Sequence, residues 1–145
     1  MEKQFALPNM EYKFSIQVIG EESGLNWTGD FVYRRPNLKQ RGMIEVMMRR
    51  LCGDLRTLSA DVESFNEALA HLRFTLIESP DWWQSADFGG NLFDGNVIIE
   101  IYNKCIEFEA DWKSKVHGGK QGNVSASASG GEEKAPVASP AVGNA

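Results

Sequence analysis

Few residues in this chain have the chemistry and spacing of a catalytic or metal-binding site. The 145 residues include two histidines, His71 and His117. Neither has a second His or Cys at the spacing of a zinc site, and no local motif sets a Ser or Cys nucleophile beside a His base. We therefore expect a protein that is not an enzyme and that uses no metal ion and no cofactor.

Glycines and aspartates in the second half of the chain have structural explanations. Gly89-Gly90 lacks the Lys-Ser/Thr that follows a phosphate-binding loop and the strand that precedes one. Asp81, Asp87 and Asp94 do not have the alternating spacing of a calcium loop. We interpret Asp81 as a first-turn acid after Pro80, and Asp94 as the N-terminal cap of the last helix.

Charged residues are distributed unevenly along the sequence. From Arg34 to Arg56 seven basic residues accompany two acidic ones, whereas from Thr57 to Trp112 eleven acidic residues accompany two basic ones. The net charge of -5 argues against nucleic-acid binding, since a binding face would have to be kept clear of many carboxylates. The opposed segments could pair within the chain or meet neighbouring molecules, so self-association stays open.

Hydrophobic periodicity predicts an α+β fold. Apolar and polar residues alternate strictly from Tyr12 to Ile19, turn residues occupy 20–24, and a second alternating run ends at Arg34, which indicates a β-hairpin. Helical spacing then begins after Asn37 and Ser59, which we predict as N-terminal caps, and again after Asp94; Gly53-Asp54 is predicted to end the first of these helices. Because a lone hairpin is marginal in water, we expect it to pack on a bundle of about three helices.

Composition sets the expected domain boundaries. We predict a single α+β domain over residues 1–117. Residues 118–145 are rich in Gly, Ser, Ala and Pro and contain no aromatic residue, so we predict a disordered tail. The sequence has no apolar run of membrane-spanning length and no N-terminal signal pattern, so no membrane partner is expected and the protein is expected in the cytosol.

The segment Ser79-Pro80-Asp81-Trp82-Trp83 and the loop behind it supply the candidate partner-binding residues. Pro80 ends the preceding helical pattern, which runs from Ala60 to Ile77. The candidate residues are aromatic or aliphatic side chains on this corner and loop, namely Trp82, Trp83, Phe88, Leu92 and Phe93. The same tryptophans could instead fill the core between two helices, and both interpretations stay open.

Three methionines in the first helical segment allow a similar pair of interpretations. Met43, Met47 and Met48 could form an adaptable surface for a partner, or they could fill the core.

The second half of the chain resembles small proteins encoded among the tail genes of long-tailed bacteriophages. The resemblance rests on the Pro80-Asp81-Trp82 corner, the Gly/Asp loop, and a helix in which Ile98 and Tyr102 form an Ile-x-x-x-Tyr pattern. Within that group the closest role is the tail assembly chaperone. The resemblance implies binding to the tape measure protein and to tail tube subunits in the host cytoplasm, without a cofactor or an active site.

Two other roles fit the same features. The chain could be a structural virion component, such as a minor tail or head-tail connector protein, in which the hairpin adds strands to a neighbour. It could also be a small host-directed binding protein.

Overall fold

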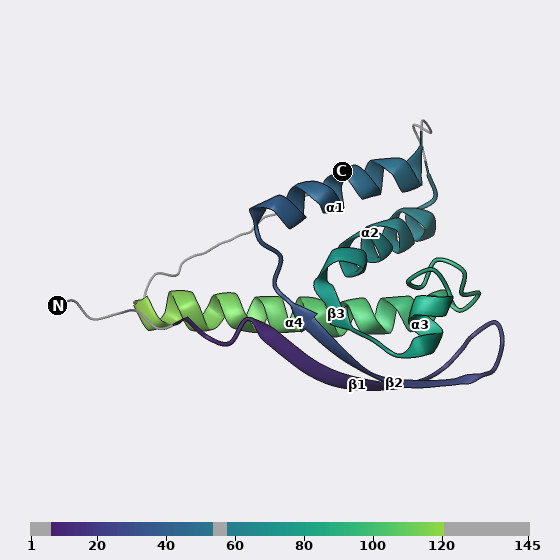
Figure 1. Ribbon diagram of the computed structural model, residues 1–145, viewed down its shortest axis with the longest axis horizontal. Coiled ribbons are helices and arrows are strands. Elements are labelled where there is room, and N and C mark those ends of the chain that lie inside the picture. Colours follow the sequence, from purple (N-terminus) through teal and green to yellow (C-terminus); the bar gives the residue numbers. More distant parts are fainter. Residues whose placement is uncertain (1–6, 54–57, 121–145) are drawn as a thin grey trace, which may run out of the picture. The chain divides into compact units, whose positions relative to one another are not determined.

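The computed structural model describes residues 7–53 and 58–120 and confirms the α+β class (Figure 1). The elements, in chain order, are β1 (Glu11–Ile19), β2 (Asn26–Arg34), α1 (Leu38–Cys52), α2 (Ala60–Thr75), β3 (Leu76–Glu78), α3 (Asp81–Ser85) and α4 (Gly95–Lys120). Helix α4 runs past residue 118, where the tail was predicted to begin, and residues 121–145 of that tail lie outside the described residues.

The chain divides into two compact units, Asn9–Glu109 and Met1–Pro8 with Ala110–Ala145. In the second of these units the Trp112 side chain is buried, and its indole Nε1 donates a hydrogen bond to the Pro8 carbonyl at 3.3 Å. The strands, α1, α2, α3 and the first part of α4 all belong to the unit Asn9–Glu109.

The hairpin forms as the alternating pattern predicts. β1 and β2 pair antiparallel in a continuous register from Glu11–Arg34 to Ile19–Asn26. Aromatic rings cover the inward face of the hairpin, where stacked pairs form between neighbouring rings at centroid distances of 5.0–5.4 Å. The stacked rings are those of Tyr12, Phe14 and Phe31 from the hairpin and Phe108 from α4.

A third strand replaces the end of the helix predicted from Ala60 to Ile77. α2 stops at Thr75, whose hydroxyl donates to the His71 carbonyl, and β3 then pairs antiparallel with β2. The prediction was wrong because the apolar residues of β3 fit a helical stripe and a strand equally well. The unpaired edge of β2, which sequence periodicity does not reveal, provides the hydrogen-bond partners for the strand.

Local capping signals set the helix boundaries as predicted. The Asn37 side chain accepts from the Gln40 N–H, and the Gln40 side chain accepts from the Asn37 N–H, which forms a capping box at the start of α1. Gly53 ends α1 with a positive φ of 66°. Ser59 caps α2 by accepting from the Val62 N–H.

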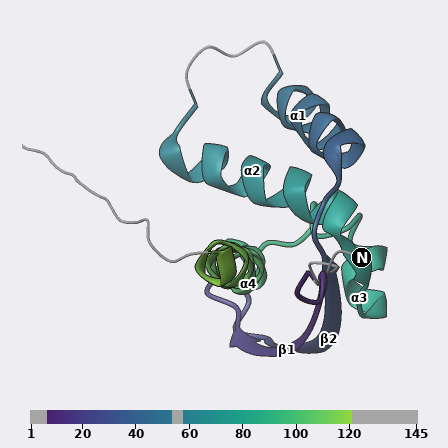
Figure 2. The ribbon, with the colours of Figure 1, turned by 90° about the vertical axis from the view of Figure 1, so that its left-hand side faces the viewer.

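The core lies between the sheet, α2 and the first part of α4 (Figures 1 and 2). Its fully or nearly fully buried members come from every one of these elements and from α3: Phe14, Ile16, Phe31, Tyr33, Ala68, Leu72, Trp83, Val97, Ile98, Ile101 and Cys105. α1 contributes no buried residue and packs on α2, outside this core. α2 therefore has neighbours on two sides, and small Ala68 lies on its core side.

Candidate partner-binding site

The five residues predicted to bind a partner do not form one surface. Trp83 is fully buried and Phe93 is 86% exposed. Trp82, Phe88 and Leu92 are half-buried and pack against the core.

Trp83 belongs to the core, which is one of the two interpretations that the sequence left open for the tryptophans. Its ring meets Phe31 edge-on at a centroid distance of 5.9 Å. A Cβ on Gly89 would lie 2.5 Å from the Trp83 ring, and Gly89 also has a φ of 91°, so only glycine fits there. The sequence could not decide this, because burial of Trp83 depends on where the hairpin lies.

Trp82 fixes the Pro80 corner to strand β2. Its indole Nε1 donates to the Thr28 carbonyl at 2.8 Å, and its ring lies 4.8 Å from that of Trp27. Pro80 occupies the space where Gly29 has no side chain, since a Cβ on Gly29 would come within 2.5 Å of Pro80 Cγ. Gly29, which interrupts the apolar face of β2, is thus the contact point for the corner.

Phe88 is held at the edge of α2 rather than in the core. The Arg73 guanidinium lies 4.2 Å from the centroid of the Phe88 ring, in a cation–π contact. Asp87 and Phe88 both have a φ of 54°, a conformation that non-glycine residues seldom adopt. The loop therefore holds Phe88 beside the surface formed by α1 and α2.

Two adjoining hollows on that surface form what we call the α1–α2 groove. The first, of about 620 Å³, is lined by Lys39, Gly42, Met43, Val46, Met47, Arg50, Arg73 and Phe74. The second, of about 310 Å³, shares Met47, Arg50 and Arg73 and continues to Leu51, Leu69, Asp87, Phe88 and Gly90.

The groove was not predicted as a site, although its methionines gave a signal. Met43 and Met47 line the first hollow, as the adaptable-surface interpretation expects, whereas Met48 lies in a separate hollow of about 240 Å³. Of the five predicted partner-binding residues, Phe88 alone lines the groove. The apolar spacing of α1 is that of a core helix, and the sequence did not show that α1 packs on α2 alone among the helices and strands of the described residues.

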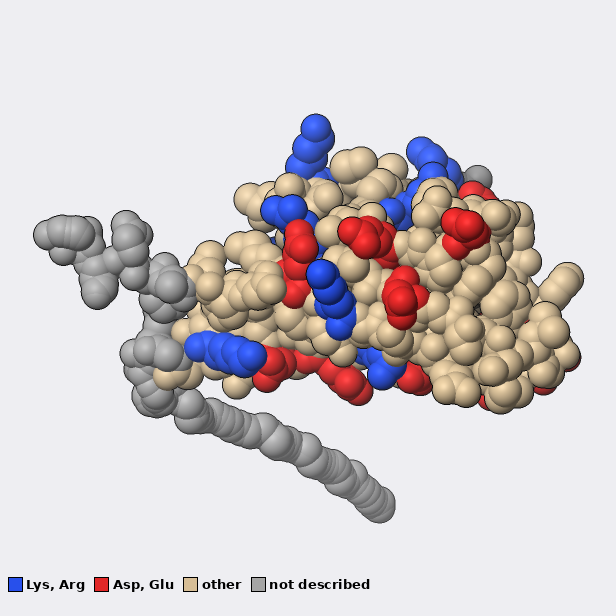
Figure 3. Space-filling model, turned by 60° about the horizontal axis from the view of Figure 1, so that its bottom comes forward, with Lys and Arg blue, Asp and Glu red and all other residues tan. Residues whose placement is uncertain are grey.

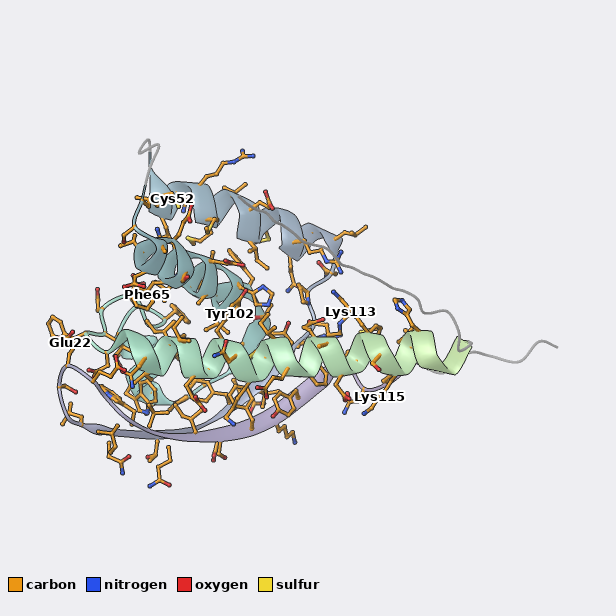
Figure 4. The ribbon with its side chains drawn as sticks, turned by 180° about the vertical axis from the view of Figure 1, so that it is seen from behind. Glu22, Cys52, Phe65, Tyr102, Lys113 and Lys115 are labelled. Carbon is orange, nitrogen blue, oxygen red and sulfur yellow. The ribbon has the colours of Figure 1, made fainter. Side chains whose placement is uncertain are left out.

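The Asp94 carboxylate binds the turn between β1 and β2. It accepts hydrogen bonds from the backbone N–H of Glu22 and Ser23, from the Ser23 hydroxyl and from Trp27 Nε1, at 2.5–2.9 Å. Figure 4 shows Glu22 on the turn beside the start of α4. Asp94 directly precedes α4 and its backbone carbonyl accepts from the Val97 N–H at 3.0 Å, so it lies at the predicted N-terminal position of the last helix. Its carboxylate, however, bonds to the hairpin turn rather than to the first turn of that helix.

This arrangement explains the electrostatics of Asp94. The Ser23 hydroxyl, together with the backbone N–H groups and the Trp27 indole, stabilises the carboxylate and lowers the pKa of Asp94 to about 2, against the opposing effect of burial. Asn96 adds two bonds to the same turn, from its amide to the Ile19 carbonyl and from the Glu21 N–H to its oxygen. A Cβ on Gly20 would collide with the Asp94 carboxylate.

A partly buried polar cluster joins β2, α2 and α4. The Tyr33 hydroxyl donates to Glu109, lies 3.1 Å from His71 Nε2, and shares Glu109 with Arg35, whose Nε is 2.8 Å from the carboxylate. Burial, followed by the bond to Glu109, raises the pKa of Tyr33, and burial lowers the pKa of His71. Neutral His71 can then donate from Nε2 to the Tyr33 oxygen.

The same side of α4 carries Tyr102, which reaches toward α2 in Figure 4 and donates to Glu67 at 3.2 Å. Burial, followed by the nearby Glu67 charge, raises the pKa of Tyr102 to about 12. Both tyrosines thus stay protonated at neutral pH and act as hydrogen-bond donors between elements.

Comparisons with known proteins give no family assignment: no protein-family model, curated protein or solved structure matches the chain. Within residues 7–53 and 58–120, no group of three His, Cys, Asp or Glu side chains is placed to hold a metal ion. Among the helices of the described residues, none combines the length and the apolar character that crossing a membrane requires. The fold and the groove thus define a small α+β protein with an apolar, basic-edged surface.

Replacing Trp83 tests its place in the core. Trp83→Ala should lower the free energy of unfolding by about 3–5 kcal/mol, because it removes a large buried ring and leaves a cavity. Phe93→Ala is the matched control, and at an exposed site it should change the free energy by less than about 0.5 kcal/mol. Urea unfolding followed by tryptophan fluorescence or circular dichroism measures both, and a fully stable Trp83→Ala variant would contradict the core assignment.

Acid unfolding tests the Asp94 contact. The pKa of Asp94 is lower in the folded chain than its ordinary value of 3.8, so its stabilising effect is complete above about pH 4 and is lost as pH falls toward about 2. Asp94→Asn should be less stable than wild type at pH 7, and the difference should shrink across this window. Urea unfolding at stepped pH measures the difference, and a gap that stays constant from pH 5 to pH 2 would refute the assignment.

Proposed function

We propose that this chain is a non-enzymatic tail assembly chaperone of a bacteriophage, which binds the tape measure protein, the tail tube protein or both in the host cytoplasm. The observation that carries the proposal is the incomplete burial of α1. None of its fifteen residues is buried, and Leu38, Met43, Val46 and Leu51 are 81%, 41%, 55% and 42% exposed. Met43, Val46 and Leu51 line the α1–α2 groove, and exposed apolar side chains gathered at one place are typical of a protein-interaction surface.

The exposed apolar side chains of α1 suit a helix that covers apolar surface on a partner protein. A chaperone of this kind shields apolar surface on its partner until assembly provides a permanent contact, which requires burial rather than chemistry. The groove offers methionine side chains, which adapt to different partner shapes. The polar cluster around Tyr33 serves the fold, because its acid, base and hydroxyl are bonded to one another.

One observation favours the alternative of a structural virion component. The strand order β1-β2-β3 leaves the outer edge of β1 unpaired among the described residues, over nine residues. An unpaired edge can accept a strand from a neighbouring subunit. A host-directed binding protein remains a third proposal, for which α1 would be the contact surface as well.

Coexpression with the tape measure and tail tube proteins of the same bacteriophage tests the chaperone proposal. The chain should copurify with the tape measure or tail tube protein and should be absent from finished particles. Stoichiometric presence in purified particles would support the virion component instead, and capture of a host protein without tail proteins would support the host-directed role.

Two exposed valines provide a matched pair of variants for the same assay. Val46 lines the groove on α1, whereas Val62 lies on α2 outside it, and they are 55% and 43% exposed. Val46→Asn should weaken binding to the tail protein about tenfold, because burial of a valine contributes about 1.5 kcal/mol. Val62→Asn should leave binding unchanged, and equal effects of the two variants would contradict a contact through α1.

A further inference from the structure

Glycine at position 42 is unexplained by the packing of the chain itself. Gly42 lies in the interior of α1, where glycine is unfavourable relative to alanine. A Cβ built there meets no atom within 4 Å, so no neighbouring group in the described residues requires its absence. Yet Gly42 lines the first hollow of the α1–α2 groove, where a side chain would fill space that is now open.

The charges around the groove are mostly positive. Lys39 and Arg50 of α1 and Arg73 of α2 line the hollows, and Asp87 is the single acid among the lining residues. Asp87 lies 3.9 Å from Arg73 in a solvent-exposed ion pair, while no carboxylate in the described part of the chain lies within ion-pair distance of Lys39 or Arg50. In Figure 3, basic side chains stand along the upper edge, the side on which α1 lies in Figure 1.

The shape of the groove favours a helix over a bilayer or a nucleic acid. α1 has fifteen residues and is therefore about 22 Å long, which matches an opposing helix of four turns. Methionine, valine and phenylalanine side chains line the first hollow, and Leu51, Leu69 and Phe88 add to the lining of the second. A flat membrane surface would not fill such hollows, and phosphate groups would meet an apolar lining.

We propose that the α1–α2 groove binds an acidic amphipathic helix of a partner protein. The apolar face of that helix packs on Met43, Val46, Met47 and Phe74, with its closest approach at Gly42. Glutamate or aspartate side chains along its flanks pair with Lys39 and Arg50. The inference rests on the proposed partner-binding function, and it adds the place of contact and the chemistry of the partner.

Two designed peptides of eighteen residues test the charge preference. Both carry leucine and phenylalanine on one face of a helix, and the flanking positions carry glutamate in one peptide and lysine in the other. Fluorescence anisotropy with the full chain should show at least tenfold tighter binding of the glutamate peptide. Raising the salt concentration should reduce this preference, because exposed charges are screened.

Variants at Gly42 test the place of binding. Gly42→Trp should weaken binding of the glutamate peptide at least tenfold by filling the first hollow, and it should fold normally because space is open at this position. Gly42→Ala should raise the melting temperature, because alanine favours a helix, and it should weaken binding less than Gly42→Trp does, because a single methyl group fills little of the hollow. Arg50→Glu should reverse the preference between the two peptides, whereas Arg41→Glu, on the same helix outside the groove lining, should not.

Several results would overturn the inference. Equal affinity for the two peptides would contradict a preference for acidic partners. Normal binding by a folded Gly42→Trp variant would contradict binding in the groove. A wild-type dimer that Gly42→Trp dissociates, seen by sedimentation, would assign the groove to a second copy of the chain. Binding to anionic phosphatidylglycerol vesicles without binding to either peptide would assign α1 to a membrane surface.

The inference and the proposed function can fail separately. If the glutamate peptide binds in the groove but no tail protein binds the chain, the chaperone proposal fails and the inference stands. If tail proteins bind wild type and Gly42→Trp equally, the chaperone proposal stands and the inference fails.

Discussion

The bond between the Asp94 carboxylate and the turn of the hairpin is the contact on which the rest of the fold depends. A hairpin alone cannot hold its position in water, and its apolar face needs a fixed cover. That cover is α4, and Asp94 at its start holds the hairpin against it by accepting four hydrogen bonds from Glu22, Ser23 and Trp27. With that end fixed, the aromatic rings of the hairpin extend along α4 as far as Phe108.

The opposite end of the sheet is held by different chemistry. Tyr33 and Glu109 join β2 to α4, and His71 brings α2 into the same cluster. Between these two polar contacts the Pro80 corner closes the core, with Pro80 against Gly29 and Trp83 against Gly89. The hairpin, α2, α3 and α4 thus complete a core in which α1 has no part.

Sequence reasoning recovered the features that depend on neighbouring residues. The hairpin, the Asn37 and Ser59 caps and the end of α1 at Gly53 follow from alternation, side-chain capping and positive φ. It failed where a partner lies far along the chain: β3 depends on the free edge of β2, and Asp94 depends on a turn more than seventy residues earlier. The sequence left the burial of Trp83 open for the same reason, since its contact with Phe31 joins residues far apart in the chain.

Because α1 lies outside the completed core, its glycine and its exposed apolar residues need an explanation other than core packing. A helix needed only to protect α2 would gain stability from alanine at position 42 and from polar residues at exposed positions such as Val46. Instead α1 keeps glycine and exposed apolar side chains beside Lys39 and Arg50, whose charges meet no carboxylate among the described residues. The glycine leaves the free protein less stable and the exposed apolar side chains leave it less soluble, and a bound acidic helix would cover the apolar side chains and pair with the two basic ones.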